Sequence, residues 1–485
     1  MEDTLLYKPR LGDERRQDSV SLLSSGTSII SWERLAEEIA RLSWLAGPLI
    51  AITLTQYLLF IVALTMAGHL GKLTLSSTAI AISIANVSGY SILIGLASAL
   101  ETLCGQSYGA QQYQKVGKQV HTAIFCLILV CCPISVLWAY MRNILIFLGQ
   151  DPTISTEAGK FIICLIPSLF AYAALQPLQR YFQTQSMVTP MLITSVITLC
   201  FHICLCWLLV FNSALGSIGA ALSICLSHWF NVIAMGLYMM FSSACAKTRA
   251  PLSLELFSGI KEFFRFAIPS TIMLCLEWWS FELLILLSGL LPNPELETSI
   301  LSVCLTTVST LYAFPYGLGA AASTRVSNEL GAGNYQAVRT IVYAVTCLTS
   351  IETIIISVTL YLCRSSFGYI FSNDKGVIEY ASSMAPLLSL SVMFDHFQGV
   401  LSGITRGCGW QHIGAFINLG AFYLFGIPIA ITLAFWMHLR GLGLWLGILS
   451  GSFIQSASLF VVNLRINWEK LANQTKDRIF RSNLC

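Results

Sequence analysis

The sequence predicts an all-α membrane protein with twelve transmembrane helices in two pseudo-symmetric six-helix lobes. Three observations support this prediction: the composition, a series of apolar runs and an internal repeat. Of the 485 residues, 55% are hydrophobic and 11% are charged, whereas soluble domains carry about 25% charged residues. Because so few charged side chains cannot cover a globule in water, we expect the chain to lie in a lipid bilayer.

Twelve apolar runs each approach the length of about 20 residues that a membrane-spanning helix needs. They cover residues 43–67, 77–100, 119–141, 158–180, 189–211, 216–241, 264–290, 299–323, 338–363, 380–402, 413–436 and 441–463. The first six runs predict an N-lobe at 43–241 and the last six a C-lobe at 264–463, with a cytosolic linker at 242–263. Two tails complete the prediction: a cytosolic N-terminal tail at 1–42 that ends in an amphipathic interfacial segment, and a cytosolic C-terminal tail at 464–485.

The two halves of the sequence resemble each other. The segment Gly109–Tyr113 has a counterpart in Gly331–Tyr335 at an offset of about 222 residues, and Tyr90 falls on Tyr312 at the same offset. Since each half holds an even number of spans, both halves have the same orientation, and the pseudo-two-fold axis runs along the membrane normal. Repeats of this kind usually enclose a central binding site between them.

The distribution of charge orients the chain in the membrane, and the net charge and the cysteine spacing exclude several classes of function. Basic residues follow every second apolar run, which places both termini in the cytosol, and the loop at 292–298 on the opposite side is acidic. A net charge of +3 gives no reason to expect binding to nucleic acid. The sixteen cysteines lack the spacing of metal or redox sites. Plasma membrane and vacuolar membrane both fit this orientation.

Carboxylates inside the apolar runs are the main candidates for function. Glu277 and Glu282 lie in the seventh run and Asp395 in the tenth. A charged side chain at the bilayer centre costs on the order of 3 kcal/mol, so such residues face protein or water. Five residues of separation put the two glutamates roughly 140° apart on a helix, so Glu282 is expected to face a neighbouring helix or to lie higher on the cavity wall. Burial disfavours the charged form of a carboxyl group, which suits it to exchange protons.

Further residues are expected to line a central cavity. Ser391, Asp395 and Gln398 share one face of the tenth run, which favours a cavity wall over simple bonding between helices. The other candidates are aromatic residues and prolines within the runs: Trp278, Tyr312, Tyr316, Pro48 and Pro269. Trp278 is compatible with ligand stacking and equally with a lipid-facing or core position. The two prolines lie at similar depths of paired helices and are hinge candidates, because proline removes a backbone hydrogen bond.

Two residues refine this prediction. Gln56 in the first run aligns with Glu277, so the acids are expected only in the second half of the chain. Glu352 in the ninth run is a further candidate that stands alone in an apolar stretch. The sequence has no Walker loop, HExxH, Rossmann glycine motif or GxSxG elbow, so nothing indicates an enzyme or a cofactor other than a coupling ion.

Several motifs are similar to those of one transporter family. The segments Glu277–Glu282, Leu291–Ser299, Arg325–Gly333, Glu101–Ala110 and Arg406–Gln411 closely resemble plant members of the multidrug and toxic compound extrusion (MATE) family. The resemblance implies a twelve-helix, two-lobed antiporter that exports organic compounds against an inward proton or sodium gradient. It also implies that Glu277 and Asp395 form the cation site of the C-lobe and that Pro48 is the bending proline of the first helix.

Together these observations predict a secondary antiporter that exports xenobiotics or cationic or aromatic secondary metabolites in exchange for protons, by alternating access. Sodium coupling stays open, because the same pair of acids serves sodium in some bacterial relatives. A flippase for lipids or lipid-linked glycans predicts many basic residues within the membrane, and the runs contain few. The expected partners are small organic molecules and the lipid bilayer, and we expect a monomer.

Overall fold

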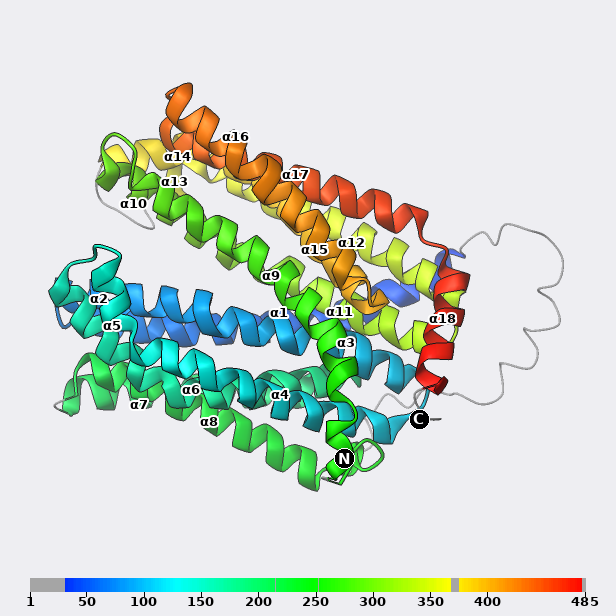
Figure 1. The fold of residues 1–485 in the computed structure, drawn as a ribbon. Coiled ribbons are helices and arrows are strands. Elements are labelled where there is room, and N and C mark those ends of the chain that lie inside the picture. Colours follow the sequence, from blue (N-terminus) through cyan, green and yellow to red (C-terminus); the bar gives the residue numbers. More distant parts are fainter. Residues whose placement is uncertain (1–30, 214, 252, 368–374, 482–485) are drawn as a thin grey trace.

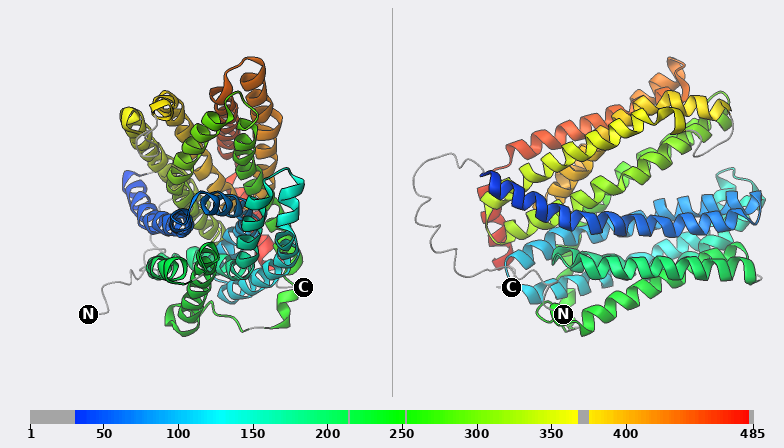
Figure 2. Two further views of the ribbon diagram at one scale, coloured as in Figure 1. Left: turned by 90° about the vertical axis from the view of Figure 1, so that its left-hand side faces the viewer. Right: turned by 180° about the vertical axis from the view of Figure 1, so that it is seen from behind.

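The computed structural model describes residues 31–213, 215–251, 253–367 and 375–481. In this part of the chain, twelve helical segments are long and apolar enough to cross a membrane. Figures 1 and 2 show them in two groups, α1 to α8 and α9 to α17, with α18 lying across one end. The predicted class of an all-α protein with twelve spans is therefore confirmed.

The first lobe contains eight α-helices, which are α1 (Trp32–Gly68), α2 (Lys72–Ala85), α3 (Ser91–Gly109), α4 (Tyr113–Ala139), α5 (Met141–Phe147), α6 (Pro152–Thr184), α7 (Val188–Trp207) and α8 (Ser217–Phe241). A π-helical segment, Asn86–Tyr90, joins α2 to α3, and the two helices form one span. Helix α6 begins where the Asp151 carboxylate accepts hydrogen bonds from the backbone N–H groups of Thr153 and Ile154, at 2.8 and 3.1 Å. A carboxylate at this position satisfies donors that the first turn leaves open.

The second lobe contains α9 (Ile260–Ser288), α10 (Pro294–Leu311), α11 (Ala313–Gly331), α12 (Tyr335–Leu362), α13 (Arg364–Phe367), α14 (Lys375–Cys408), α15 (Gln411–Asn418), α16 (Ile427–Ile431) and α17 (Arg440–Arg465). Short π-helical segments at Leu419–Gly426 and Thr432–Trp436 join α15 and α16 into one span. Tyr312 separates α10 from α11, as its counterpart Tyr90 ends the π segment before α3.

The internal repeat appears as a reciprocal contact between α3 and α11. A Cβ atom on Gly109 would lie 1.9 Å from the Asn328 carbonyl oxygen, and one on Gly331 would lie 2.0 Å from the Gln106 carbonyl oxygen. Asn328 and Gln106 are related by the same offset as the two glycines. Only glycine permits so close an approach of two backbones, and the reciprocity places the pseudo-two-fold axis between these helices.

Of the predicted N-terminal tail, residues 1–30 lie outside the described residues. The amphipathic segment that begins at Ser31 forms the first turns of the continuous helix α1, and its interfacial position stays a prediction. The C-terminal tail contains helix α18 (Trp468–Arg481), which the sequence analysis did not predict. In α18, the Arg478 guanidinium donates to Gln106 and lies 4.7 Å from the centre of the Phe266 ring, and burial lowers its pKa.

The lobes meet at the end of the molecule where α18 lies and diverge toward the opposite end, as the right-hand view of Figure 2 shows. Helix α18 packs against α11 and α12 at this end. Pro48 and Pro269 are inside the uninterrupted helices α1 and α9, and their role as hinges stays a prediction.

Candidate functional site

A central cavity of about 500 Å³ lies between the lobes. Helices α1, α2 and α6 contribute to its wall from the first lobe, and α9, α10, α11 and α14 contribute from the second. The residues that the sequence placed on the cavity and that line it in the structure are Glu277, Trp278, Glu282, Tyr312, Tyr316, Asp395 and Gln398. Residues from widely separated spans therefore meet at one site.

The Glu277 carboxylate has hydrogen-bond donors on both oxygens. Its Oε1 accepts from Tyr312 Oη at 2.9 Å and from Gln398 Nε2 at 2.8 Å. Its Oε2 accepts from Gln455 Nε2 at 3.2 Å and from Asn418 Nδ2 at 3.5 Å. All four donors are neutral, and the side chain is 6% exposed. Such a set stabilises a carboxylate in the membrane while leaving its charge available to a ligand.

Sequence reasoning missed two of these donors. Asn418 and Gln455 are polar residues inside the eleventh and twelfth apolar runs, and that position was the only signal that could have singled them out. Gln455 Nε2 also donates to Asn418 Oδ1 at 2.8 Å, and Asn418 Nδ2 donates to the Met273 carbonyl oxygen at 2.7 Å. The two amides therefore hold each other in place behind Glu277.

Asp395 is the second carboxyl group on this wall, 3% exposed and on α14 less than one turn before Gln398. The polar stripe predicted on α14 is only partly correct. Ser391 does not line the cavity, because its Oγ accepts a hydrogen bond from Trp445 Nε1 at 2.8 Å and is buried between α14 and α17. A helix face that looks continuous in sequence turns away from the cavity as α14 packs against α17.

Glu282 also lines the cavity, one and a half turns along α9 from Glu277. Its Oε2 accepts from Ser83 Oγ on α2 at 3.3 Å, across the gap between the lobes. This position agrees with the expectation that Glu282 lies higher on the wall than Glu277. Trp278 lines the cavity beside Phe281, which places its ring where a ligand could stack.

The wall from the first lobe is aromatic. The ring centres of Tyr90 and Tyr172 are 4.8 Å apart, those of Tyr172 and His228 are 5.3 Å apart, and Phe60 lies 5.6 Å from Tyr90. Ser168 links two of these residues, since its Oγ lies 2.9 Å from Tyr90 Oη and 2.7 Å from His228 Nδ1. This cluster presents an apolar surface to the aromatic or alkyl part of a ligand.

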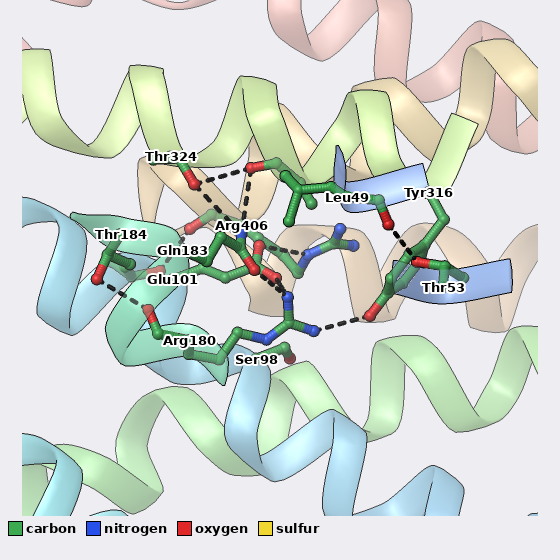
Figure 3. Close-up of polar contacts among 12 residues, drawn as sticks. Leu49, Thr53, Ser98, Glu101, Arg180, Gln183, Thr184, Tyr316, Thr324 and Arg406 are labelled. Carbon is green, nitrogen blue, oxygen red and sulfur yellow. Dashed lines mark hydrogen bonds and ion pairs between the residues drawn. The ribbon is translucent and has the colours of Figure 1, made fainter. Parts of the chain in front are cut away.

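A charged triad lies at the end of the cavity nearest α18, and Figure 3 shows its polar contacts. Glu101 on α3 lies 2.9 Å from Arg180 on α6 and 3.0 Å from Arg406 on α14, and Arg180 Nη2 donates to Tyr316 Oη at 2.7 Å. The Glu101 carboxylate is 1% exposed, and its ion pair with Arg406 joins the two lobes. We refer to Glu101, Arg180 and Arg406 as the closing triad.

Two equivalent hydrogen bonds reinforce the same contact. Gln106 Nε2 donates to the Gly407 carbonyl oxygen at 3.0 Å, and Asn328 Nδ2 donates to the Thr184 carbonyl oxygen at 3.1 Å. The two donors, Gln106 and Asn328, are related by the internal repeat, and each bonds to a carbonyl oxygen of the opposite lobe. The structure is therefore closed at the α18 end by bonds between the lobes that an opening motion must break.

Glu352 lies away from the cavity. Its Oε1 is 2.9 Å from His396 Nδ1, and neither residue lines the cavity, although His396 follows Asp395 in the sequence. A helical turn of about 100° per residue separates the two side chains. The pair links α12 to α14.

Two lobes related by a pseudo-two-fold axis around a cavity at their interface define a secondary transporter. A model of the MatE family matches residues 48–208 and 269–432. Protein DETOXIFICATION 12 of Arabidopsis thaliana is 55% identical over 475 residues, which is 97% of this chain and 99% of that protein. Protein DETOXIFICATION 13 of the same plant is 54% identical, over 97% of this chain and 99% of the relative.

The crystal structure of a eukaryotic MATE transporter, AtDTX14, matches with a TM-score of 0.90 and 54% identity, over 92% of this chain and 100% of that one. The outward-facing conformation of another MATE family transporter matches with a TM-score of 0.79 at 13% identity, which shows a shared fold. The chain belongs to the MATE family. It is a multi-pass membrane transporter of the multidrug efflux type and not an enzyme.

Proposed function

We propose that the protein exports organic compounds with an aromatic body and a cationic group, in exchange for protons. The observation that carries this proposal is the presence of Glu277 and Asp395 on the wall of one cavity, opposite the aromatic cluster of the first lobe. Carboxyl groups in such a place bind either a proton or a cationic substrate, and not both at once. That mutual exclusion is what antiport requires.

The α18 end is taken as cytosolic, because the basic linker and C-terminal segments lie on that side of the sequence topology. The structure then represents a state closed to the cytosol by the closing triad. Protons from an acidic outer compartment, whether the apoplast or the vacuole, neutralise Glu277 and Asp395 and release the substrate. After the lobes reorient, the carboxyl groups lose their protons to the cytosol, and affinity for the next substrate is restored. A membrane potential contributes about 2.3 kcal/mol per charge per 100 mV.

The test is export from proteoliposomes driven by an imposed pH gradient, with Glu277→Gln and Asp395→Asn compared with wild type. Both variants are expected to lose gradient-driven export. Glu352→Gln is the matched control, because it removes an intramembrane carboxylate that does not line the cavity. Export at the wild-type rate by folded Glu277→Gln or Asp395→Asn protein would refute the assignment.

Sodium coupling is the alternative within the same site. A sodium gradient at equal pH on both sides distinguishes the two ions, since proton exchange predicts no export under that condition. A flippase for lipid-linked glycans has little support, because Arg180 is the one Lys or Arg among the described residues that line the cavity.

A further inference from the structure

The closing triad carries an excess positive charge. Glu101 supplies one carboxylate, while Arg180 and Arg406 supply two guanidinium groups, and all three side chains are buried. The other acceptors of Arg180 on the cavity side are neutral: Tyr316 Oη at 2.7 Å from Nη2, and Gln183 Oε1 at 2.5 Å from Nη1. The Glu277 carboxylate, which lines the same cavity as Arg180, already has four donors of its own. A buried ion is unfavourable unless an opposite charge compensates it, so this end of the cavity favours an anion.

The polar atoms around the cavity that have no hydrogen-bond partner are all donors. Among the described residues that line it, the buried side-chain polar atoms without a hydrogen-bond partner are Gln56 Nε2, Gln179 Nε2 and Arg180 Nε. All three are N–H donors, and all three come from α1 and α6 of the first lobe. Most buried donors in proteins have an acceptor, so these three indicate a ligand that brings acceptor oxygens.

Tyr316 adds a further donor at the same place. Its hydroxyl accepts from Arg180 Nη2 at 2.7 Å, and its own hydrogen remains available for donation into the cavity that it lines. Gln179 and Arg180 are consecutive residues of α6. The side-chain amide and the guanidinium group therefore line the cavity from the same turn of this helix. A carboxylate, with two oxygens and about four acceptor positions, matches several donors that line the same cavity.

We propose that Arg180, with Gln56, Gln179 and Tyr316, forms an anion subsite that binds the carboxylate or phenolate group of an aromatic substrate. Gln56, Gln179 and Arg180 lie on the first lobe, whereas Tyr316 and the carboxyl groups of Glu277 and Asp395 lie on the second. The cavity thus has two poles, and aromatic acids or amphoteric aromatic compounds are substrates beside cations. This inference rests on the proposed function for the identity of the cavity as the transport site.

The test uses two probes with the same aromatic body and opposite charge, tryptamine and indole-3-propionate. Their dissociation constants are measured by calorimetry on purified protein in lipid nanodiscs, in chloride-free gluconate buffer. Arg180→Gln is expected to weaken indole-3-propionate about tenfold or more, since a charge-assisted hydrogen bond is lost. The dissociation constant of Arg180→Gln for tryptamine is expected to stay within about twofold of wild type. Glu277→Gln is expected to weaken the binding of tryptamine alone.

Folding is controlled within the same experiment. Arg180→Gln leaves Glu101 and Arg406 as a neutral pair, and retained tryptamine binding shows that the protein is folded. Arg180→Lys keeps the charge and is expected to restore most of the indole-3-propionate affinity. If Arg180→Gln does not fold, Gln179→Leu is used, which leaves the closing triad intact and is expected to weaken only indole-3-propionate, by roughly three- to tenfold.

Three outcomes would overturn the proposal. The first is an unchanged affinity for indole-3-propionate in Arg180→Gln or Gln179→Leu, and the second is a parallel loss of affinity for both probes. The third is displacement of indole-3-propionate by chloride as readily as by aliphatic propionate at equal concentration. The last result would assign the subsite to a small inorganic anion. Binding is measured without any ion gradient, so failure here is independent of the proteoliposome test of proton exchange.

Discussion

The closing triad predicts an unusual order of stability for its variants. Removing Glu101 leaves two buried guanidinium groups side by side with no carboxylate, whereas removing Arg406 leaves a neutral pair of Glu101 and Arg180. Breaking a buried ion pair so that a charge is left uncompensated costs about 3–5 kcal/mol, and Glu101→Gln leaves two such charges. Arg406→Gln loses one pairing and one interaction between lobes, about 1–3 kcal/mol. Glu101→Gln is therefore expected to be the more damaging change by about 2 kcal/mol or more.

Two measurements check this order. Thermal unfolding in detergent should give the sequence wild type, Arg406→Gln, Glu101→Gln from highest to lowest midpoint. Hydrogen–deuterium exchange should rise at the ends of α3 and α14 nearest α18, because the closed end opens once its charges repel, and a difference of 2 kcal/mol changes the open population roughly thirtyfold. If Arg406→Gln proves as unstable as Glu101→Gln, or more so, the excess of positive charge is not a property of the folded protein.

Three further changes are expected to act at single places. Gly331→Ala should destabilise the contact between the lobes by about 1–3 kcal/mol, because its Cβ would lie 2.0 Å from a carbonyl oxygen. The control is Gly236→Ala, which should not alter the melting temperature, because its Cβ would have no atom within 4 Å. Gln455→Leu should weaken tryptamine binding at neutral pH about tenfold, because the ionised form of Glu277 loses a donor; unchanged affinity in calorimetry would contradict this. Arg478→Ala should free α18, since its hydrogen bond and ring contact contribute about 1–2 kcal/mol, and faster hydrogen exchange across 468–480 would show it.

Local features of the sequence were sufficient to predict the membrane spans and the carboxyl groups within them. Hydropathy over about 20 residues depends only on neighbouring residues, so the twelve runs correspond to twelve helical segments in the described chain. A carboxylate such as Glu277 or Asp395 inside such a run must avoid lipid wherever the helix packs, which is why both could be assigned to protein or water without coordinates. The repeat was equally readable, because the Gly109 and Gly331 segments keep the same residues for the same close contact.

The partners of these acids depended on long-range packing. Gln455 and Glu277 are 178 residues apart, and Glu101 and Arg406 are 305 apart, so no local pattern relates them. Ser391 shows the same limit of sequence reasoning. The sequence correctly placed it on the polar face of α14, but α17 packs against that part of the helix, and Ser391 does not reach the cavity.

The sequence by itself thus determined the number of spans, their two-fold repeat and the presence of carboxylates within the membrane, since each follows from composition and spacing along a single helix. The tertiary structure alone decided which donors surround Glu277, where the excess positive charge of the closing triad lies, and which end of the cavity is closed. These depend on the relative rotation and tilt of whole helices, which arise from the sum of many weak contacts between distant segments.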